Sequence, residues 1–166
     1  MEIGFRPVES ADFPMLREWI ARPHIRRWWG EPEAEVAMIA ESLRAPGFAA
    51  FIIRLDGRDA GSIQWWKPDG TWEIPVAAPP ETTRGIDLSL AEETDCGRRI
   101  GRRVIEAFVA RLAAEGVRRV VIDPHPENER ARRAYAAAGF AEAGQGVHCE
   151  GPYVLMVRDI CEKVET

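Results

Sequence analysis

The sequence predicts one α/β domain built on a mixed sheet, and three observations support this prediction. The chain has 166 residues, which is the usual size of a single domain. Its middle part has the pattern of a β-hairpin, while its second half alternates strand-like and helix-like segments, as mixed α/β sheets do. Because no repeat, low-complexity stretch or long linker interrupts the chain, we expect a single domain over residues 1–166.

The N-terminal third is expected to contain one strand and up to three helices. Residues 3–8 read as a strand, and Ser10 is a suitable N-cap for a helix. That helix carries apolar residues at helical spacing, namely Met15, Leu16, Trp19 and Ile20. Pro23 should end it, after which residues 25–29 form a turn or a short helix. Residues 33–45 follow as another helix with an apolar face.

The middle of the chain predicts a hairpin followed by a long loop. Residues 48–55 and 60–66 are strand-like, and Asp56-Gly57 between them has the composition of a tight hairpin turn. Residues 67–84 are rich in Pro, Gly and Thr and show no regular period, so we expect a loop. A loop of this length in a compact domain usually has a function. Residues 85–90 form the next expected strand.

The second half predicts helices between strands. A long helix is expected over residues 97–115, with Gly116 as its C-terminal cap. The remaining expected elements, in order, are a buried strand over 117–122, a helix over 128–138 ended by Gly139, and strands over 140–144 and 153–157.

Charge and composition exclude several classes of protein. The chain carries 22 Lys and Arg against 27 Asp and Glu, a formal net charge of -5, which argues against a nucleic-acid partner and is compatible with a cationic substrate. Its longest apolar runs are far short of the roughly 20 residues that span a bilayer, and its first residues do not resemble a signal peptide. We therefore expect no membrane partner and a cytoplasmic location.

Cysteine and histidine residues indicate neither a disulfide framework nor a metal site. The three cysteines, Cys96, Cys149 and Cys161, are odd in number and include no closely spaced pair. The three histidines are scattered along the chain, without the spacing of metal ligands. We expect incidental thiols and no metal.

The first candidate functional motif is Cys-Gly-Arg-Arg-Ile-Gly-Arg-Arg at residues 96–103, where a strand leads into a helix. Glycines at such a turn let backbone N–H groups approach a phosphate, and the helix N-terminus adds partial positive charge. The four arginines could hold a pyrophosphate and a further phosphate. The alternative is a tight turn followed by a solvent-exposed basic helix face, because short glycine-rich motifs often match by chance.

The second motif starts with Asp-Pro-His-Pro-Glu-Asn at residues 123–128 and continues to Tyr135 and to Ala-Gly-Phe at 138–140. A strand is expected to end at Asp123 and a helix to begin at Asn128. Tyr135 comes seven residues after Asn128, so the two side chains share one helix face. Taken alone, such a tyrosine is more often an ordinary residue at the edge of the core.

Together the two motifs resemble those of the GCN5-related N-acetyltransferase (GNAT) family. The matching features are the strand at 85–90, the phosphate turn with its long helix, the buried strand, and the pattern of Asn128, Ala131, Tyr135 and Gly139-Phe140. More narrowly, residues 24–30, 84–90, 123–128 and 150–152 are similar to segments of aminoglycoside 6'-N-acetyltransferases. The resemblance implies one N-acetyltransferase domain with a mixed, mostly antiparallel central sheet flanked by helices.

The phosphate turn departs from the family pattern at two positions. The family usually has Gln or Arg, two variable residues, Gly, one variable residue, and then Gly or Ala. This chain has Cys96 at the first position and Arg99 in place of the inner glycine, while Gly97 and Gly101 remain. Arg99 would either crowd the backbone beside the pyrophosphate or bind it through its side chain. We favour side-chain binding, because Gly97 still gives the turn conformational freedom.

The resemblance implies acetyl transfer from acetyl-coenzyme A to a primary amine. An ammonium ion must lose a proton before it attacks, and the family position for that base is Asp87, which would otherwise be a solvent-facing acid at a strand end. The leaving thiolate needs a proton, which a phenol with a pKa of about 10 can supply from the family position at Tyr135. The implied cofactor-binding residues are Leu88, Ser89, Leu90, Gly97, Arg98, Arg99, Ile100, Gly101, Arg102, Asn128 and Ala131.

A polycationic acceptor would need carboxylates and flat aromatic surfaces. The resemblance implies contacts from Trp28, Trp29, Trp72, Glu73, Asp87, Asp123 and Glu150, to an acceptor most like an aminoglycoside with a 6'-amine. At least one Trp of each neighbouring pair would instead pack in the core. Asp123 has a rival role as a cap near the helix that begins at Asn128.

Other functions stay open at the level of the sequence. Siderophore-pathway enzymes that acylate an N-hydroxylysine-type group, and enzymes that acetylate protein N-termini, share many of these motifs. Cys96 and Arg99 also allow a GNAT-fold module that binds without catalysis, although the joint presence of Asp87, Asn128 and Tyr135 argues against it. The expected partners are a small-molecule amine and coenzyme A, and the expected assembly is a monomer or a homodimer.

Overall fold

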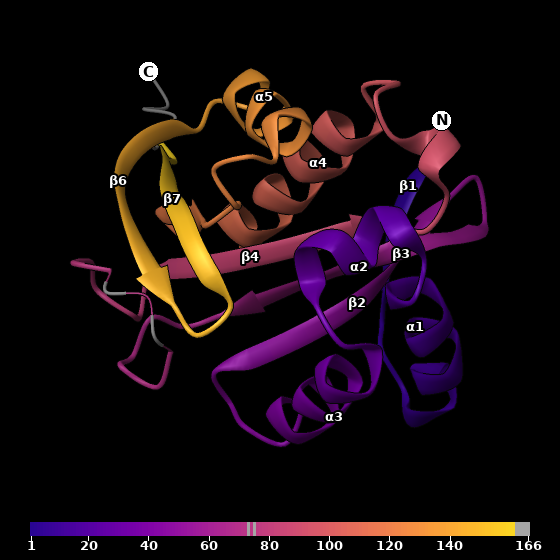
Figure 1. Ribbon diagram of the computed structural model, residues 1–166. Coiled ribbons are helices and arrows are strands. Elements are labelled where there is room, and N and C mark those ends of the chain that lie inside the picture. The colour runs from indigo at the N-terminus through magenta and orange to yellow at the C-terminus, as the bar shows by residue number, and fades with distance from the viewer. Residues whose placement is uncertain (73, 75, 162–166) are drawn as a thin grey trace.

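The computed structural model describes residues 1–72, 74 and 76–161. The elements in chain order are β1 (Ile3–Pro7), the 3-10 turn η1 (Ser10–Asp12), α1 (Phe13–Ile20), α2 (Pro23–Trp29), α3 (Pro32–Ser42), β2 (Phe48–Leu55), β3 (Arg58–Trp66), β4 (Thr83–Leu90), the 3-10 turn η2 (Glu93–Asp95), α4 (Ile100–Ala114), β5 (Arg119–Ile122), α5 (Glu129–Ala137), β6 (Ala141–His148) and β7 (Gly151–Asp159). In the described part of the chain, the strands form one seven-stranded sheet, whose strand order is β1-β2-β3-β4-β5-β7-β6. Neighbouring strands are antiparallel except β4 and β5, which are parallel. The predicted mixed, mostly antiparallel sheet flanked by helices is confirmed (Figure 1).

Helices cover both faces of this sheet (Figure 1). On β2, Phe51 and Ile53 face the core under α4 and α5, while Ala50 and Ile52 face the core under α1, α2 and α3. Burial on both faces explains why the inner strands read as continuous apolar runs rather than as alternating patterns. Within the described part of the chain, no helix has the length and apolar character needed to cross a membrane.

The two parallel strands diverge. Their paired positions are Thr83 with Arg119, Arg84 with Val120, and Gly85 with Val121. β4 nevertheless continues to Leu90, still paired with β3 on its other side. From Ile86 onward, the edge of β4 that faces β5 has left the ladder, and its backbone groups are available to another partner.

The long helix starts later than the sequence predicts. It begins at Ile100 rather than at residue 97, because Gly97 (φ 78°) and Arg99 (φ 62°) both adopt the left-handed backbone conformation. An α-helix cannot include such residues, and the conformation costs a non-glycine residue roughly 1–2 kcal/mol. Arg99 therefore adopts a backbone conformation that glycine takes more readily than arginine does.

Two other sequence-based expectations are wrong. Ser10 is not the N-cap of the first helix but the first residue of η1, where Glu9 and Asp12 form a capping box and Arg6 binds the Asp12 carboxylate (2.9 Å). The last two strands are longer than expected and form one hairpin, with His148 opposite Gly151. β6 is mostly exposed along its length, so it lacks the apolar pattern that marks a buried strand.

Gly85 allows β3 and β4 to approach each other at the base of the divergence. It lies opposite Trp66, whose side chain is buried, and a Cβ at position 85 would lie 2.0 Å from Trp66 Cε2. We expect Gly85→Ala to lower the free energy of unfolding by about 2 kcal/mol or more, measured by urea denaturation. Gly101→Ala is the matched control, because a Cβ there meets nothing within 4 Å. Equal stability of the two variants would contradict this packing.

Candidate active site

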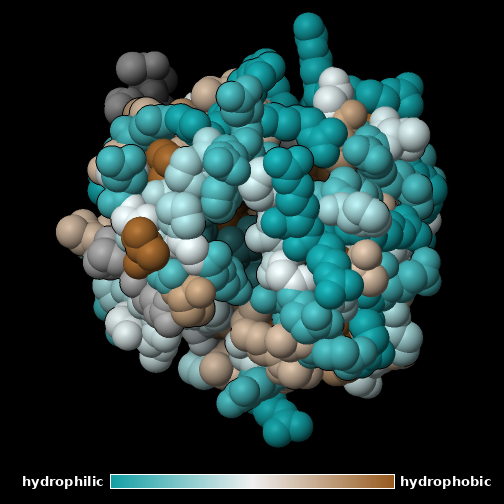
Figure 2. All heavy atoms as spheres, in the orientation of Figure 1, coloured by the Kyte–Doolittle hydropathy of each residue, from teal (hydrophilic) through white to brown (hydrophobic). Residues whose placement is uncertain are grey.

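A cavity of about 1140 Å³ opens where β4 and β5 diverge. One wall comes from β4, the end of β5 and the start of α5, and the other from α2, α3 and the turn between β6 and β7. Figure 2 shows a hollow near the middle of the face of the molecule that it presents. A cavity of this size can bury most of the surface of a small-molecule ligand, even a large one.

Most residues that the sequence implicates line this cavity. They are Trp28, Trp29, Trp72, Asp87, Leu88, Ser89, Leu90, Gly97, Arg99, Gly101, Arg102, Asp123, Asn128, Ala131, Tyr135 and Glu150. Arg98 and Ile100 do not, since Arg98 is exposed and Ile100 packs against the core beneath α4. Glu73 lies outside the described residues. Among those described, no group of three or more His, Cys, Asp and Glu side chains could hold a metal ion.

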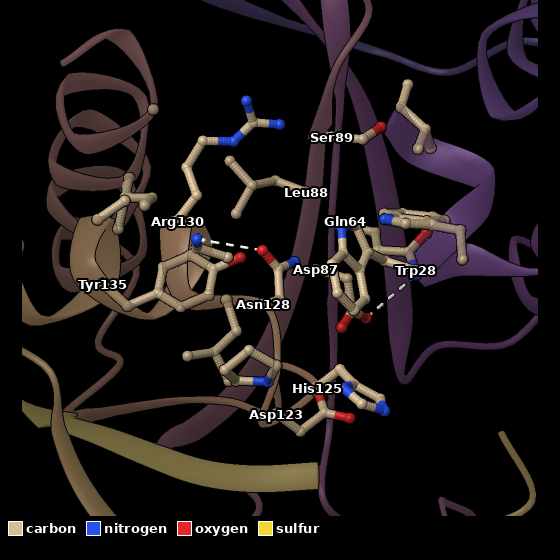
Figure 3. Close-up of a pocket in the computed structure, with 18 of the residues that line it drawn as sticks. Trp28, Gln64, Asp87, Leu88, Ser89, Asp123, His125, Asn128, Arg130 and Tyr135 are labelled. Atoms are coloured by element: carbon tan, nitrogen blue, oxygen red, sulfur yellow. Dashed lines mark hydrogen bonds between the residues drawn. The ribbon is translucent and has the colours of Figure 1, made fainter. Parts of the chain in front are cut away.

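Asp87 stands on β4 at the centre of the cavity (Figure 3). Gln64, its neighbour across the β3–β4 ladder, donates a hydrogen bond to it (Nε2 to Oδ2, 3.2 Å). Burial raises the pKa of Asp87 well above its usual range, the charges of nearby acids raise it further, and the Gln64 bond acts in the opposite direction. Asp87 therefore holds a proton more tightly than an exposed carboxylate does, as a base for an ammonium ion requires.

Three more carboxyl groups face the same end of the cavity, namely Glu35 from α3, Asp123 from the end of β5 and Glu150 from the β6–β7 turn. Glu35 and Glu150 are hydrogen-bonded to each other, and two carboxyl groups can share such a bond only if one of them holds a proton. Burial, and then the charge of Glu150, raises the pKa of Glu35 to about 8. This end of the cavity attracts cations, and an ammonium ion placed there would displace the shared proton.

Asp123 and Glu150 are joined through His148. The distance from His148 Nε2 to Asp123 Oδ2 is 3.3 Å, and the backbone N–H of Glu150 donates to His148 Nδ1 (3.2 Å). The side chains of His148 and Asp123 are both 13% exposed. The cap of α5 is Asn128 itself, whose Oδ1 accepts a hydrogen bond from Ala131 N (3.3 Å). Asp123 is therefore oriented by the β6–β7 hairpin rather than by α5.

Tyr135 projects from α5 toward Asn128 and the cavity (Figure 3). Its side chain is buried and its ring packs against Phe140, with 6.2 Å between ring centroids. Burial, followed by the charges of Asp87 and Asp123, raises the pKa of the phenol above its ordinary value. The hydroxyl therefore keeps its proton at neutral pH and can donate it. Tyr135 belongs both to the edge of the core and to the cavity wall.

The opposite end of the cavity carries positive charge. The arginines that line it are Arg99, Arg102, Arg130 and Arg133. Arg102 and Arg133 form ion pairs with glutamates one turn away on their own helices. Across the part of the chain that the structure describes, Arg99 and Arg130 form no ion pair, and Figure 3 shows Arg130 extending from the start of α5 toward Leu88. Two guanidinium groups are thus available to an anion.

The turn before α4 adds to this positive end. Gly97 and Gly101 both line the cavity, and a Cβ at either position would meet nothing within 4 Å. The backbone at the start of α4 is therefore uncovered, and the first N–H groups of a helix have no partner within the helix. A helix N-terminus of this kind attracts anions such as phosphate.

Aromatic rings form the remaining wall. Trp28 from α2 lies against His125, with 5.4 Å between ring centroids, and Trp72 packs on Trp66 at 5.5 Å. Trp29 lies half-buried against the core under α1, α2 and α3. The tryptophans that the sequence implicates therefore both pack in the interior and present flat surface to the cavity.

Sequence reasoning did not assign Glu35, Gln64, Arg130 and His148 to the site. Glu35 and Gln64 carry no local signal, because only the folded sheet and α3 bring them near Asp87. Arg130 and His148 lie within two residues of Asn128 and Glu150, so the segments at 123–128 and 150–152 were the available signal for them.

A model of the "acetyltransferase (GNAT) domain" family matches residues 9–147. Aminoglycoside N(6')-acetyltransferase type 1 from Klebsiella pneumoniae is 32% identical over 168 residues, which cover 94% of this chain and 82% of that protein. The range matched by the family model includes both sequence motifs, at residues 96–103 and 123–140.

Solved structures of similar fold carry ligands of two kinds. AAC(6')-Ib in complex with paromomycin and acetyl-coenzyme A has a TM-score of 0.84 and 32% identity, and the match covers 96% of this chain and 94% of that one. AAC(6')-Ib with coenzyme A and kanamycin has a TM-score of 0.83 and 32% identity, with 95% of each chain covered.

Because Glu35 holds a proton that it shares with Glu150, the free energy of unfolding should depend on pH. An unfolded chain releases that proton near the ordinary pKa of 4.5, whereas the folded protein holds it to about 8. The free energy of unfolding therefore falls as the pH rises between these two values. We expect Glu35→Gln to raise the free energy of unfolding at pH 8 by about 1–3 kcal/mol, and by much less at pH 5.

The control for this prediction is Glu41→Gln, on the exposed side of the same helix. Urea denaturation of both variants and the wild type at pH 5 and pH 8 provides the measurement. A Glu35→Gln effect of equal size at the two pH values, or one matched by Glu41→Gln, would show that Glu35 does not hold the proton.

Proposed function

Because the chain belongs to the GNAT acetyltransferase family, we propose that it transfers an acetyl group from acetyl-coenzyme A to the 6'-amine of an aminoglycoside. The observation that carries the proposal is the division of charge in one cavity. Available guanidinium groups and an uncovered helix N-terminus line this cavity together with several carboxyl groups, and Figure 3 shows Asp87 and Tyr135 between Arg130 and Asp123. Such a cavity suits a reaction between an anionic and a cationic substrate.

The residues of the positive end fit the coenzyme. Acetyl-coenzyme A supplies an acetyl group activated as a thioester, on an arm that contains amide groups and a pyrophosphate. The open edge of β4 can pair with amide groups, and Arg99, Arg130 and the start of α4 suit the pyrophosphate. The cofactor-binding set proposed from the cavity is Leu88, Ser89, Leu90, Gly97, Arg99, Gly101, Arg102, Asn128, Arg130 and Ala131. Arg98 and Ile100 do not line the cavity, but they belong to the turn that leads into α4 and stay in the proposed set for that reason.

Asp87 and Tyr135 supply the proton transfers. Asp87 accepts a proton from the acceptor's ammonium group, directly or through water, and the neutral amine attacks the thioester carbonyl carbon. The C–N bond forms, the C–S bond breaks, and Tyr135 donates a proton to the departing thiolate. Backbone N–H groups of residues 88–90 stabilise the charge on the carbonyl oxygen. The ammonium nitrogen loses two protons in the whole reaction. One is accounted for by the proton that the new thiol gains, and the other is released to solvent.

The acidic end selects the acceptor. Glu35, Asp123 and Glu150 place several carboxyl groups around one space, which favours a molecule with several ammonium groups over a neutral amine. Trp28 and Trp72 offer apolar faces for sugar rings. A peptide N-terminus carries one ammonium group and would leave most of these acids unpaired.

We also propose that residues 1–166 act as one N-acetyltransferase domain in the cytoplasm. The family match over residues 9–147 and the continuity of the sheet across both halves of the chain support a single domain. The supply of acetyl-coenzyme A from central metabolism supports a cytoplasmic location.

An acceptor panel tests the proposed function. Kanamycin and ribostamycin carry a 6'-amine, and paromomycin carries a 6'-hydroxyl in its place. We expect thiol release from acetyl-coenzyme A with the first two compounds and none above the acceptor-free control with paromomycin, followed with a colorimetric thiol reagent. Silence with all three would reject an aminoglycoside acceptor, and equal release with paromomycin would reject the 6'-amine as the site of transfer.

Arg130 should bind the coenzyme through its phosphates. Loss of one charge-assisted hydrogen bond costs about 1.5–3 kcal/mol, so we expect Arg130→Gln to raise KM for acetyl-coenzyme A by about tenfold or more. KM for S-acetylpantetheine, which has no pyrophosphate, should not change. Arg103→Gln is the control, since this arginine donates to the Met1 carbonyl and does not line the cavity. An equal rise for both thioesters would assign Arg130 another role.

A further inference from the structure

The hairpin of β6 and β7 brings one histidine into contact with two acids of the acceptor end. His148 is the last residue of β6 and pairs with Gly151 on β7, so Cys149 and Glu150 form the connecting turn. His148 and Glu150 both line the cavity. Any movement of this turn would therefore change the position of an acceptor-facing carboxylate.

The hydrogen bonds of His148 indicate which ring nitrogen carries its proton. Nδ1 accepts the backbone N–H of Glu150 (3.2 Å), and a ring nitrogen that accepts carries no proton. The proton of the neutral imidazole is therefore on Nε2, which donates to Asp123 Oδ2 (3.3 Å). One ring thus holds the backbone of Glu150 with one nitrogen and the carboxylate of Asp123 with the other.

The imidazole ring of His148 is also held by packing against β7. It stacks on Tyr153 of β7, with 5.2 Å between centroids and 15° between ring planes. Gly146 on β6 makes this possible, because a Cβ there would lie 2.5 Å from the Tyr153 hydroxyl. β7 is in turn tied to the exit of β5, since Val154 N donates to the Pro124 carbonyl (2.9 Å). The imidazole therefore has one well-defined orientation relative to the end of β5.

We propose that His148 is a positioning residue that holds Asp123 and Glu150 at a fixed separation for two ammonium groups of the acceptor. The inference rests on the proposed function, which places the acceptor at these acids. Like charges in a confined space tend to move apart, and a polyamine gains affinity when its partners are already arranged. His148 provides that arrangement before the acceptor arrives.

A double-mutant cycle tests the inference with kanamycin as the probe. We expect His148→Ala to raise KM for kanamycin by about tenfold or more and to leave KM for acetyl-coenzyme A unchanged. His148→Gln, whose amide can accept with one atom and donate with the other, should recover most of the loss. In an Asp123→Ala background, His148→Ala should raise KM for kanamycin by clearly less than it does in the wild type, because the part of its effect that passes through Asp123 is already lost. Val147→Ala, at an exposed position of the same strand, is the control.

The tautomer of His148 gives a readout without substrate. Nitrogen-15 NMR of the resting protein should show the Nε2–H form, and a ring with its proton on Nδ1 would overturn the inference. Additive penalties in the cycle, or a loss that falls on acetyl-coenzyme A instead of kanamycin, would also overturn it. Failure of the wild type itself to release thiol with kanamycin is a different result, which rejects the proposed function and with it the acceptor that His148 is proposed to position.

Discussion

The parallel pairing of β4 with β5 ends at Gly85 and Val121 while β4 runs on to Leu90, and the rest of the site depends on this separation. Antiparallel neighbours hold each of the two strands on its outer side, so the gap is kept open by the sheet itself. Residues at the starts of α4 and α5 line the cavity that forms at this gap. The divergence thus creates the cavity and determines which residues face it.

Charge is divided along this cavity in a way that folding alone does not favour. Burial and mutual repulsion raise the pKa of Asp87 and of Glu35, so the carboxyl groups reduce the stability of the protein without a ligand. A cationic acceptor relieves that repulsion, and an anionic coenzyme does the same for Arg99 and Arg130. The arrangement is therefore one in which binding of the two substrates supplies the missing partners, and the reacting groups meet where the two regions join.

Much of the fold could be predicted from local patterns, and the exceptions have identifiable causes. β2 has the predicted bounds because both of its faces are buried and its turn residues, Asp56 and Gly57, are distinctive. β6 was predicted too short because an exposed edge strand lacks an apolar signal. The start of α4 was misplaced because Arg99 adopts the left-handed backbone conformation, which an arginine in a sequence does not predict. In the site, Asp87 and Tyr135 belong to recognisable motifs, whereas Glu35 and Gln64 reach Asp87 only through long-range packing.

The most direct test of the account is the rate of acetyl transfer in Asp87→Asn, measured as thiol release with kanamycin and acetyl-coenzyme A. Asparagine has the same shape and can still accept the Gln64 hydrogen bond, but it cannot take a proton from an ammonium ion. We expect a kcat lower by about 10²-fold or more, with KM for acetyl-coenzyme A little changed. A kcat equal to that of the wild type would contradict the role of Asp87 as the group that joins the two ends of the cavity.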